Sequence, residues 1–186
     1  MATTYLTRTP GSSSNQIKWT WSGWVKIAKV GGTLLGAWTD SSNYTQITVN
    51  ETIDYYNVTS GGIDGRLTTN RVFRDPAAWY HLVFVWDTAN GSATDRMKMY
   101  VNGVEETSFS ATTNPSSSLD SIMNSTAPQA VGARGDGGAS FFDGVMAHVH
   151  FCDGQAYAAS DFGETDATSG IWVAKTGPSV TYGDNG

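Results

Sequence analysis

Apolar and polar residues alternate with a period of two along most of this chain, and helical periodicity is almost absent. In "IKWTWSGWVKI", Trp19 and Trp21 share one face of a predicted strand, and the alternation shifts after Gly23, which predicts a bulge or bend at that glycine. The segments 33–40 and 44–50 predict two further strands, joined by the turn-rich "DSSN".

The clearest predicted unit is a hairpin preceded by a buried strand. Residues 81–87, "HLVFVWD", form a continuous apolar run of strand length, which indicates a central strand buried on both faces. The alternating segment 96–101 follows, and Asn102-Gly103 supplies the two positive-φ positions of a type I′ turn. Residues 104–109 then form the return strand.

The last strong strand is "FFDGVMAHVHFC", in which two sets of side chains alternate. One predicted face holds Val145, Ala147, Val149 and Phe151, and the other holds Met146, His148, His150 and Cys152. His148, His150 and Cys152 are zinc-ligand types, but same-face neighbours on a strand lie about 6.5–7 Å apart. A structural zinc site usually has four ligands, and the other histidine of the chain is His81. We therefore favour a partly polar strand face with Cys152 as a small apolar filler.

Many strands separated by glycine-rich turns predict an all-β fold, a jelly-roll β-sandwich of two antiparallel sheets that forms one domain over residues 1–186. The tryptophans within the apolar patterns, Trp19, Trp21 and Trp86, are predicted to lie in its core. The composition agrees, because Gly, Ser, Thr and Asn are abundant and aromatic residues make up 12% of the chain.

The net charge of −6, with 11 Lys and Arg, argues against nucleic acid and anionic lipid as partners, since both need a basic surface. Cys152 is the single cysteine, so no internal disulfide is expected. The start of the sequence lacks the apolar core of a signal peptide, and no stretch of 18 apolar residues occurs. We therefore expect a chain made in a cell's cytoplasm and no membrane insertion.

Four short motifs carry a resemblance to a known family. They are Ser22-Gly23-Trp24, Trp79-Tyr80-His81, Tyr100-Val101-Asn102-Gly103 and Phe142-Asp143-Gly144. In this order they resemble the concanavalin A-like lectin/glucanase superfamily, in its laminin-G-like and pentraxin-like branch. The resemblance implies the same jelly-roll sandwich and a lectin-like surface.

A narrower resemblance involves both ends of the chain. "YLTRTP" near the start and "DGQAYAASDFGETDATSGIW" at 153–172 are similar to proteins encoded in marine bacteriophage genomes, which are generally taken as virion components. This implies a virion structural protein, such as a capsid decoration, tail fibre or appendage, made in the host cytoplasm. Its partners would be other virion proteins or further copies of itself in a homo-oligomer.

We expect no enzymatic activity. The glucanases that the chain resembles carry their carboxylates on one strand as E-x-D-x-x-E, which this sequence lacks, and it also lacks a G-x-S-x-G elbow and a P-loop. Two alternatives stay open. One is a free carbohydrate-binding module, and the other is a polysaccharide-degrading enzyme such as a lyase that uses a tyrosine and His81 as acid and base.

We expect no cofactor, and the one alternative, which the pentraxin-like resemblance implies, is calcium. The first part of such a site maps near Asn43, with Asp40 close by, and the second maps onto "GARGDGG". There Asp136 matches one carboxylate, but Arg134 stands where an acid is expected. A calcium site would therefore use Asn43 and Asp136, with hard oxygen donors from the loops.

Glycans are the expected ligand class, and the tip between segments 33–40 and 44–50 is the predicted site. Trp38, Asp40, Asn43 and Tyr44 combine an aromatic platform with side chains that hydrogen-bond hydroxyls. The competing interpretation is that Trp38 packs under the loop while Tyr44 lies within a strand.

Overall fold

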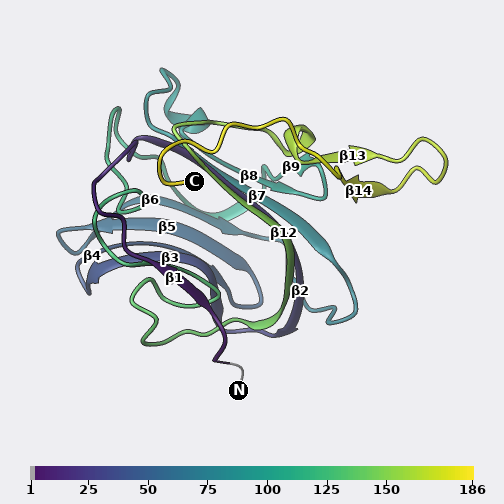
Figure 1. The fold of residues 1–186 in the computed structure, drawn as a ribbon, viewed down its shortest axis with the longest axis horizontal. Coiled ribbons are helices and arrows are strands. Elements are labelled where there is room, and N and C mark those ends of the chain that lie inside the picture. Colours follow the sequence, from purple (N-terminus) through teal and green to yellow (C-terminus); the bar gives the residue numbers. More distant parts are fainter. Residues whose placement is uncertain (1–2) are drawn as a thin grey trace.

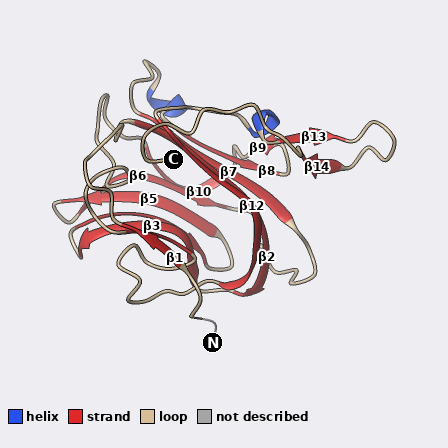
Figure 2. Cartoon of the chain, viewed as in Figure 1, coloured by secondary structure: helices blue, strands red, loops and turns tan. Residues whose placement is uncertain are grey.

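The structure, a computed structural model, describes residues 3–186 and is almost entirely β. Two large antiparallel sheets lie against each other, and a small hairpin projects at one end (Figures 1 and 2). Two short 3-10 helices, η1 (Ala93–Asp95) and η2 (Ala159–Asp161), complete the elements. Within residues 3–186, no helix has the length and apolar content needed to cross a membrane. The predicted all-β sandwich is confirmed.

The first sheet has seven strands. In spatial order they are β1 (Leu6–Arg8), β11 (Gln129–Val131), β3 (Gly32–Asp40), β4 (Asn43–Val49), β5 (Ile53–Thr59), β6 (Gly62–Thr69) and β10 (Phe109–Thr113). The pair β3–β4 is the predicted hairpin, and Trp38 lies opposite Tyr44 in its register.

The second sheet has five strands. In spatial order they are β12 (Asp143–Asp153), β2 (Lys18–Lys29), β7 (Tyr80–Asp87), β8 (Met97–Val101) and β9 (Val104–Glu105). The separate hairpin pairs β13 (Gly163–Thr165) with β14 (Trp172–Ala174). The predicted turn between β8 and β9 is confirmed, since Asn102 and Gly103 have φ of 50° and 84°.

The main core lies between the two sheets. Trp19, Trp21 and Trp86 are fully buried there, as predicted, and Tyr55 meets Trp19 edge-on at 5.8 Å between ring centroids. The indole of Trp21 also explains Gly23, because a Cβ at Gly23 would lie 2.5 Å from that ring. The glycine therefore makes room for a core tryptophan on its own strand.

A smaller apolar cluster covers the outer face of the five-stranded sheet. Its buried members are Val83, Val85, Cys152, Ala159 and Phe162. The last two come from the segment after β12, which folds back over this face in Figure 1. Strand β7 is thus buried on both sides, as its continuous apolar run predicts.

The bulge lies on a different strand from the one predicted. Strand β2 keeps its register with β7 through Gly23, while β12 shifts between Ala147 and His150, so that His148 and Val149 stand opposite Gly23. The predicted alternation along β12 is therefore wrong. Met146 and Phe151 both pack on the main core, one before and one after the bulge, and the outward set changes from odd to even numbers.

Candidate functional site

The predicted site at the β3–β4 hairpin brings its aromatic residues together. Trp38 and Tyr44 lie nearly parallel, with ring centroids 4.7 Å apart and 29° between the planes. Tyr56 on β5 meets Tyr44 edge-on at 5.8 Å. These rings form an aromatic row across three strands of the seven-stranded sheet, and all three side chains are half-buried.

The polar residues of the predicted site are engaged in the turn itself. The carboxylate of Asp40 accepts hydrogen bonds from the Ser42 amide at 2.7 Å and from Asn43 Nδ2 at 3.1 Å. Asn43 Oδ1 accepts from the amide of Ser60 at 3.1 Å. Such contacts are typical of residues that tighten a turn. The assignment of Asp40 and Asn43 to a ligand stays a prediction.

Arg134 also packs against Trp38. Its guanidinium carbon lies 4.3 Å from the centroid of the Trp38 ring, within cation–π distance. Two hydrogen bonds of 2.8 Å to Asp136 hold the guanidinium in place, and they lower the pKa of that carboxyl. Tyr44 on β4 and Arg134 in the loop after β11 thus both pack against the indole. Much of the Trp38 ring is therefore already in contact with protein groups.

The proposed calcium ligands are also separately engaged. Asp136 pairs with Arg134, and Asn43 is tied to the turn of β3 and β4. Across residues 3–186, no group of three His, Cys, Asp or Glu side chains is placed to hold a metal ion. Calcium binding by Asn43 and Asp136 stays a prediction, and the guanidinium of Arg134 already supplies the positive charge beside Asp136.

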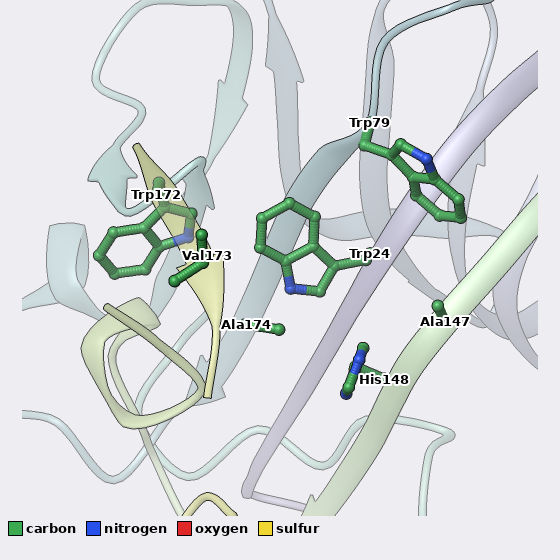
Figure 3. A pocket seen from close by; sticks show the side chains of 7 residues that line it. All are labelled: Trp24, Trp79, Ala147, His148, Trp172, Val173 and Ala174. Carbon is green, nitrogen blue, oxygen red and sulfur yellow. The ribbon is translucent and has the colours of Figure 1, made fainter. Parts of the chain in front are cut away.

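An open tryptophan-lined hollow lies on the outer face of the five-stranded sheet. We call it the tryptophan hollow. Its volume is about 330 Å³ and its lining residues are Trp24, Trp79, Ala147, His148, Trp172, Val173 and Ala174. Figure 3 shows Trp172, Trp24 and Trp79 following one another across it, with His148 at one side. Three indoles brought together from distant parts of the chain make this a binding surface suited to an apolar ligand face.

Trp172 is held in the tryptophan hollow by two close backbone approaches. A Cβ at Gly103, in the β8–β9 turn, would lie 2.7 Å from its ring, and one at Gly163 would lie 2.5 Å away. Only glycine lets the backbone come so near a flat ring at two places. The hairpin β13–β14 therefore places this tryptophan with little freedom to move.

His81 connects two of the tryptophans from beneath. The indole N–H of Trp172 donates to His81 Nδ1 at 3.0 Å, so Nδ1 carries no proton. Nε2 then carries the proton and donates to Ser22 Oγ at 2.9 Å. Trp24 lies nearly parallel to the imidazole, 5.2 Å away with 20° between planes. His81 is thus a neutral, fully buried support for both rings.

Burial lowers the pKa of His81 from 6.5 to about 4, and the charge of His150 acts in the same direction. The enzyme alternative gave His81 a role as acid or base, which would require its side chain to reach a substrate. The side chain does not line the tryptophan hollow, and both ring nitrogens are engaged in hydrogen bonds.

The bulge in β12 separates the three residues that raised the question of a zinc site. His148 sits in the bulge with φ of 48° and is exposed. His150 instead packs near Phe162, and its Nδ1 lies 2.8 Å from the hydroxyl of Tyr182. Cys152 is fully buried, and burial raises the pKa of its thiol to about 12. Cys152 is therefore an apolar filler, as predicted.

Comparison with known proteins agrees with this architecture. Residues 2–160 match the family model described as the concanavalin A-like lectin/glucanases superfamily. The chain belongs to this superfamily. No curated protein sequence matches it.

Solved structures of the superfamily resemble the chain at low sequence identity. A native heptameric SAP-like pentraxin from Limulus polyphemus is 16% identical with a TM-score of 0.59, over 93% of this chain and 86% of that one. Domains LG4–5 of the mouse laminin alpha1 chain are 12% identical with a TM-score of 0.58, over 82% and 40% of the chains.

A third structure is domain 4 of AbnA, a GH43 extracellular arabinanase from Geobacillus stearothermophilus, in complex with arabinotriose. It is 20% identical with a TM-score of 0.55, over 79% of this chain and 65% of that one. At these identities the likeness shows the fold alone. This fold agrees with the family match.

Reasoning from the sequence missed the tryptophan hollow, although one signal pointed to it. Trp19 and Trp21 are odd-numbered and face the core, so Trp24 is out of phase with them and faces outward. The supposed phase shift at Gly23 concealed this. Nothing in the sequence pattern indicated that Trp172, far along the chain, would return to the same face.

Proposed function

We propose that this chain is a bacteriophage virion structural protein, a capsid decoration, tail fibre or appendage, whose lectin-like domain binds host-surface glycans without catalysis. The tryptophan hollow is the observation that carries the glycan-binding part. It offers three indoles in a shallow hollow of about 330 Å³, and Trp79 is 40% exposed. Indole faces stack on the C–H faces of sugar rings, which makes this an attachment surface.

The lining of the tryptophan hollow supports binding rather than bond cleavage. Its seven residues include no carboxylate, hydroxyl or thiol, so they hold neither the carboxylate pair of a glycosidase nor a nucleophile. The single ionisable side chain among them is His148. A glycan held there meets flat apolar surface and one imidazole.

The virion part of the proposal rests on the resemblance of both chain ends to marine bacteriophage proteins. The end segment 153–172 has a place in this structure, because it covers the outer face of the five-stranded sheet and ends at Trp172. In this proposal the phage-like segment builds part of the glycan site. The protein would be made in the host cytoplasm, and its partners would be virion proteins or further copies of itself.

Several linked copies of the protein would also compensate for the low affinity of one shallow site. Monovalent binding on an open aromatic surface is weak, and several linked sites raise the overall affinity without new contacts. A free lectin would use the same hollow, so the virion role needs its own test. We expect the protein to co-sediment with purified phage particles, and its absence from particles would refute the virion role alone.

A glycan array tests the binding function. The array should carry host-type lipopolysaccharides, bacterial capsular glycans and algal polysaccharides, and it should be read with calcium and again with chelator. We expect hits that are lost in Trp79→Ala and kept in Trp38→Ala. Loss in Trp38→Ala alone would return the site to the β3–β4 hairpin, and calcium-dependent hits lost in Asp136→Ala would identify the predicted calcium site. An array with no hits would refute glycan binding.

A further inference from the structure

We infer that the tryptophan hollow takes an uncharged glycan chain at least two sugar rings long, and that His148 is the residue that selects it by hydrogen bonding. This inference rests on the proposed glycan-binding function and names its ligand class.

The arrangement of the indoles indicates a chain rather than a single sugar. Trp172 from β14, Trp24 from β2 and Trp79 just before β7 follow one another across the hollow in Figure 3. One sugar ring stacks on one indole, so a row of indoles offers stacking positions to successive rings. The hollow is also open at its surface, so a bound chain can extend beyond it.

The charge of the site indicates a neutral ligand. No Lys, Arg, Asp or Glu occurs among the lining residues, so a carboxylate or sulfate group on a sugar would find no permanently charged partner in the lining. The whole chain carries a net charge of −6, which repels polyanions at longer range. Uronic acid and sulfated polymers would lose their hydration here without compensation.

His148 is placed to read the hydroxyl groups of such a chain. It has φ of 48°, a strained conformation for a residue with a side chain, and the bulge presents its imidazole at the edge of the hollow. In Figure 3 the ring stands edge-on beside the row of indoles. A neutral imidazole donates one hydrogen bond and accepts another, which suits a sugar hydroxyl.

Trp24 offers a second polar contact. Its indole N–H is buried and has no hydrogen-bond partner among the described residues. In Figure 3 this nitrogen points to the side where Ala174 and His148 lie. A hydroxyl bound between His148 and Trp24 would pair the indole N–H, which removes an unsatisfied donor.

Matched pairs of hexasaccharides test the ligand class on the full chain. β-1,4-Mannan and β-1,4-mannuronan differ at C6, as do β-1,4-glucan and β-1,4-glucuronan, and each should be titrated by calorimetry beside the array. We expect array hits confined to neutral glycans and at least about tenfold tighter binding of the neutral member of a pair. Affinity should rise from mono- to trisaccharide and then level off. Tighter binding of the anionic member, or equal affinity for monosaccharide and hexasaccharide, would overturn the inference.

A glycine substitution tests His148 without straining the backbone. His148→Gly removes the imidazole while glycine adopts the positive φ freely, so the melting temperature should be unchanged or higher. We expect affinity for the best neutral array glycan to fall about tenfold. Val149→Ala is the matched control, since Val149 shares the bulge, is 38% exposed and does not line the hollow. Equal affinity of His148→Gly and the parent protein would remove His148 from the site.

Failure of this inference is distinguishable from failure of the proposed function. Anionic hits that are lost in Trp79→Ala would keep the glycan-binding function and refute the neutral class. An absence of glycan hits, together with choline binding that is lost in Trp79→Ala, would refute both, because three indoles can also hold a quaternary ammonium group.

Discussion

The outer faces of the two sheets both carry tryptophan, and they use it in opposite ways. On the seven-stranded sheet, Trp38 packs against both Tyr44 and the guanidinium of Arg134. On the five-stranded sheet, Trp24 and Trp79 line an open hollow. An aromatic side chain becomes a binding platform only where its neighbours leave a ring face free. The residue types at a turn tip are therefore weaker support for a sugar site than the observation that a ring face is free.

Replacing Trp172 should have the largest effect on the stability and glycan binding of the tryptophan hollow. Trp172→Ala removes the ring packed against Gly103 and Gly163, and it removes the indole N–H that donates to His81. We expect a loss of about 3 kcal/mol in the free energy of unfolding and of all glycan binding. Chemical denaturation and the array measure the two effects. Trp172→Phe is the matched control, and equal stability of the alanine and phenylalanine variants would show that the ring is not packed as described.

Acid should destabilise the region around the tryptophan hollow through protonation of His81. Its pKa falls from 6.5 to about 4 on burial, so the unfolded chain binds the proton first as pH drops. Stability should therefore decrease from pH 6.5 to pH 4 and lose up to about 3 kcal/mol. Below pH 4 this contribution is gone. Protonated His81 also cannot accept the Trp172 N–H, so the hollow loses its support in the same interval.

Denaturant unfolding between pH 7 and pH 4 checks this prediction, with His81→Phe as the comparison. The groups that face His81 are Ser22 and Trp24 from β2, Trp172 from β14 and the charge of His150 from β12. Burial also lowers the pKa of His150, so this residue too makes stability fall as the pH drops. The free energy of unfolding should change clearly less with pH in His81→Phe than in the parent protein. An identical pH dependence of the two would contradict the account.

Paired tryptophan variants sharpen the comparison at smaller energies. Trp79 is 40% exposed, so Trp79→Ala should lower the free energy of unfolding by only about 1–2 kcal/mol while it lowers glycan affinity about tenfold. Trp38→Ala should lower stability and leave affinity unchanged. Calorimetric titration and thermal unfolding of both variants provide the test, and a reversed pattern would exchange the roles of the two sheets.

Removing Arg134 should have the smallest effect. Arg134→Ala uncovers one face of Trp38 and frees Asp136, with a stability change below about 1 kcal/mol. We expect no change in glycan affinity, since the hollow lies on the other sheet. New binding that disappears in the double variant with Trp38→Ala would show that the β3–β4 hairpin is a site held closed by the arginine.

Much of the fold was predictable, because strand patterns and turn chemistry are local. The hairpin at Asn102-Gly103 and the doubly buried strand β7 follow directly from alternation and turn propensity. The bulge was placed on the wrong strand, since Gly23 and the His148–Val149 pair are neighbours only across the sheet. A cross-strand irregularity has no signature within one strand.

The site was less predictable than the fold for the same reason. Trp38, Asp40, Asn43 and Tyr44 lie close in sequence and drew attention as a cluster, whereas the tryptophan hollow joins β2, β12 and β14 with the residue before β7. Its assembly depends on the segment after β12 folding back over the five-stranded sheet. Tertiary packing decides where a segment so distant in sequence lies, and the pattern of a single sequence does not predict it.

Indole N–H resonances give the most direct test of the central claim. The chain has seven tryptophans, and a two-dimensional ¹H–¹⁵N spectrum resolves their side-chain signals, which Trp→Phe variants assign. Titration with the tightest-binding array glycan should shift the signals of Trp24, Trp79 and Trp172 and leave that of Trp38 in place. A shift of Trp38 with the other three unchanged would contradict the account.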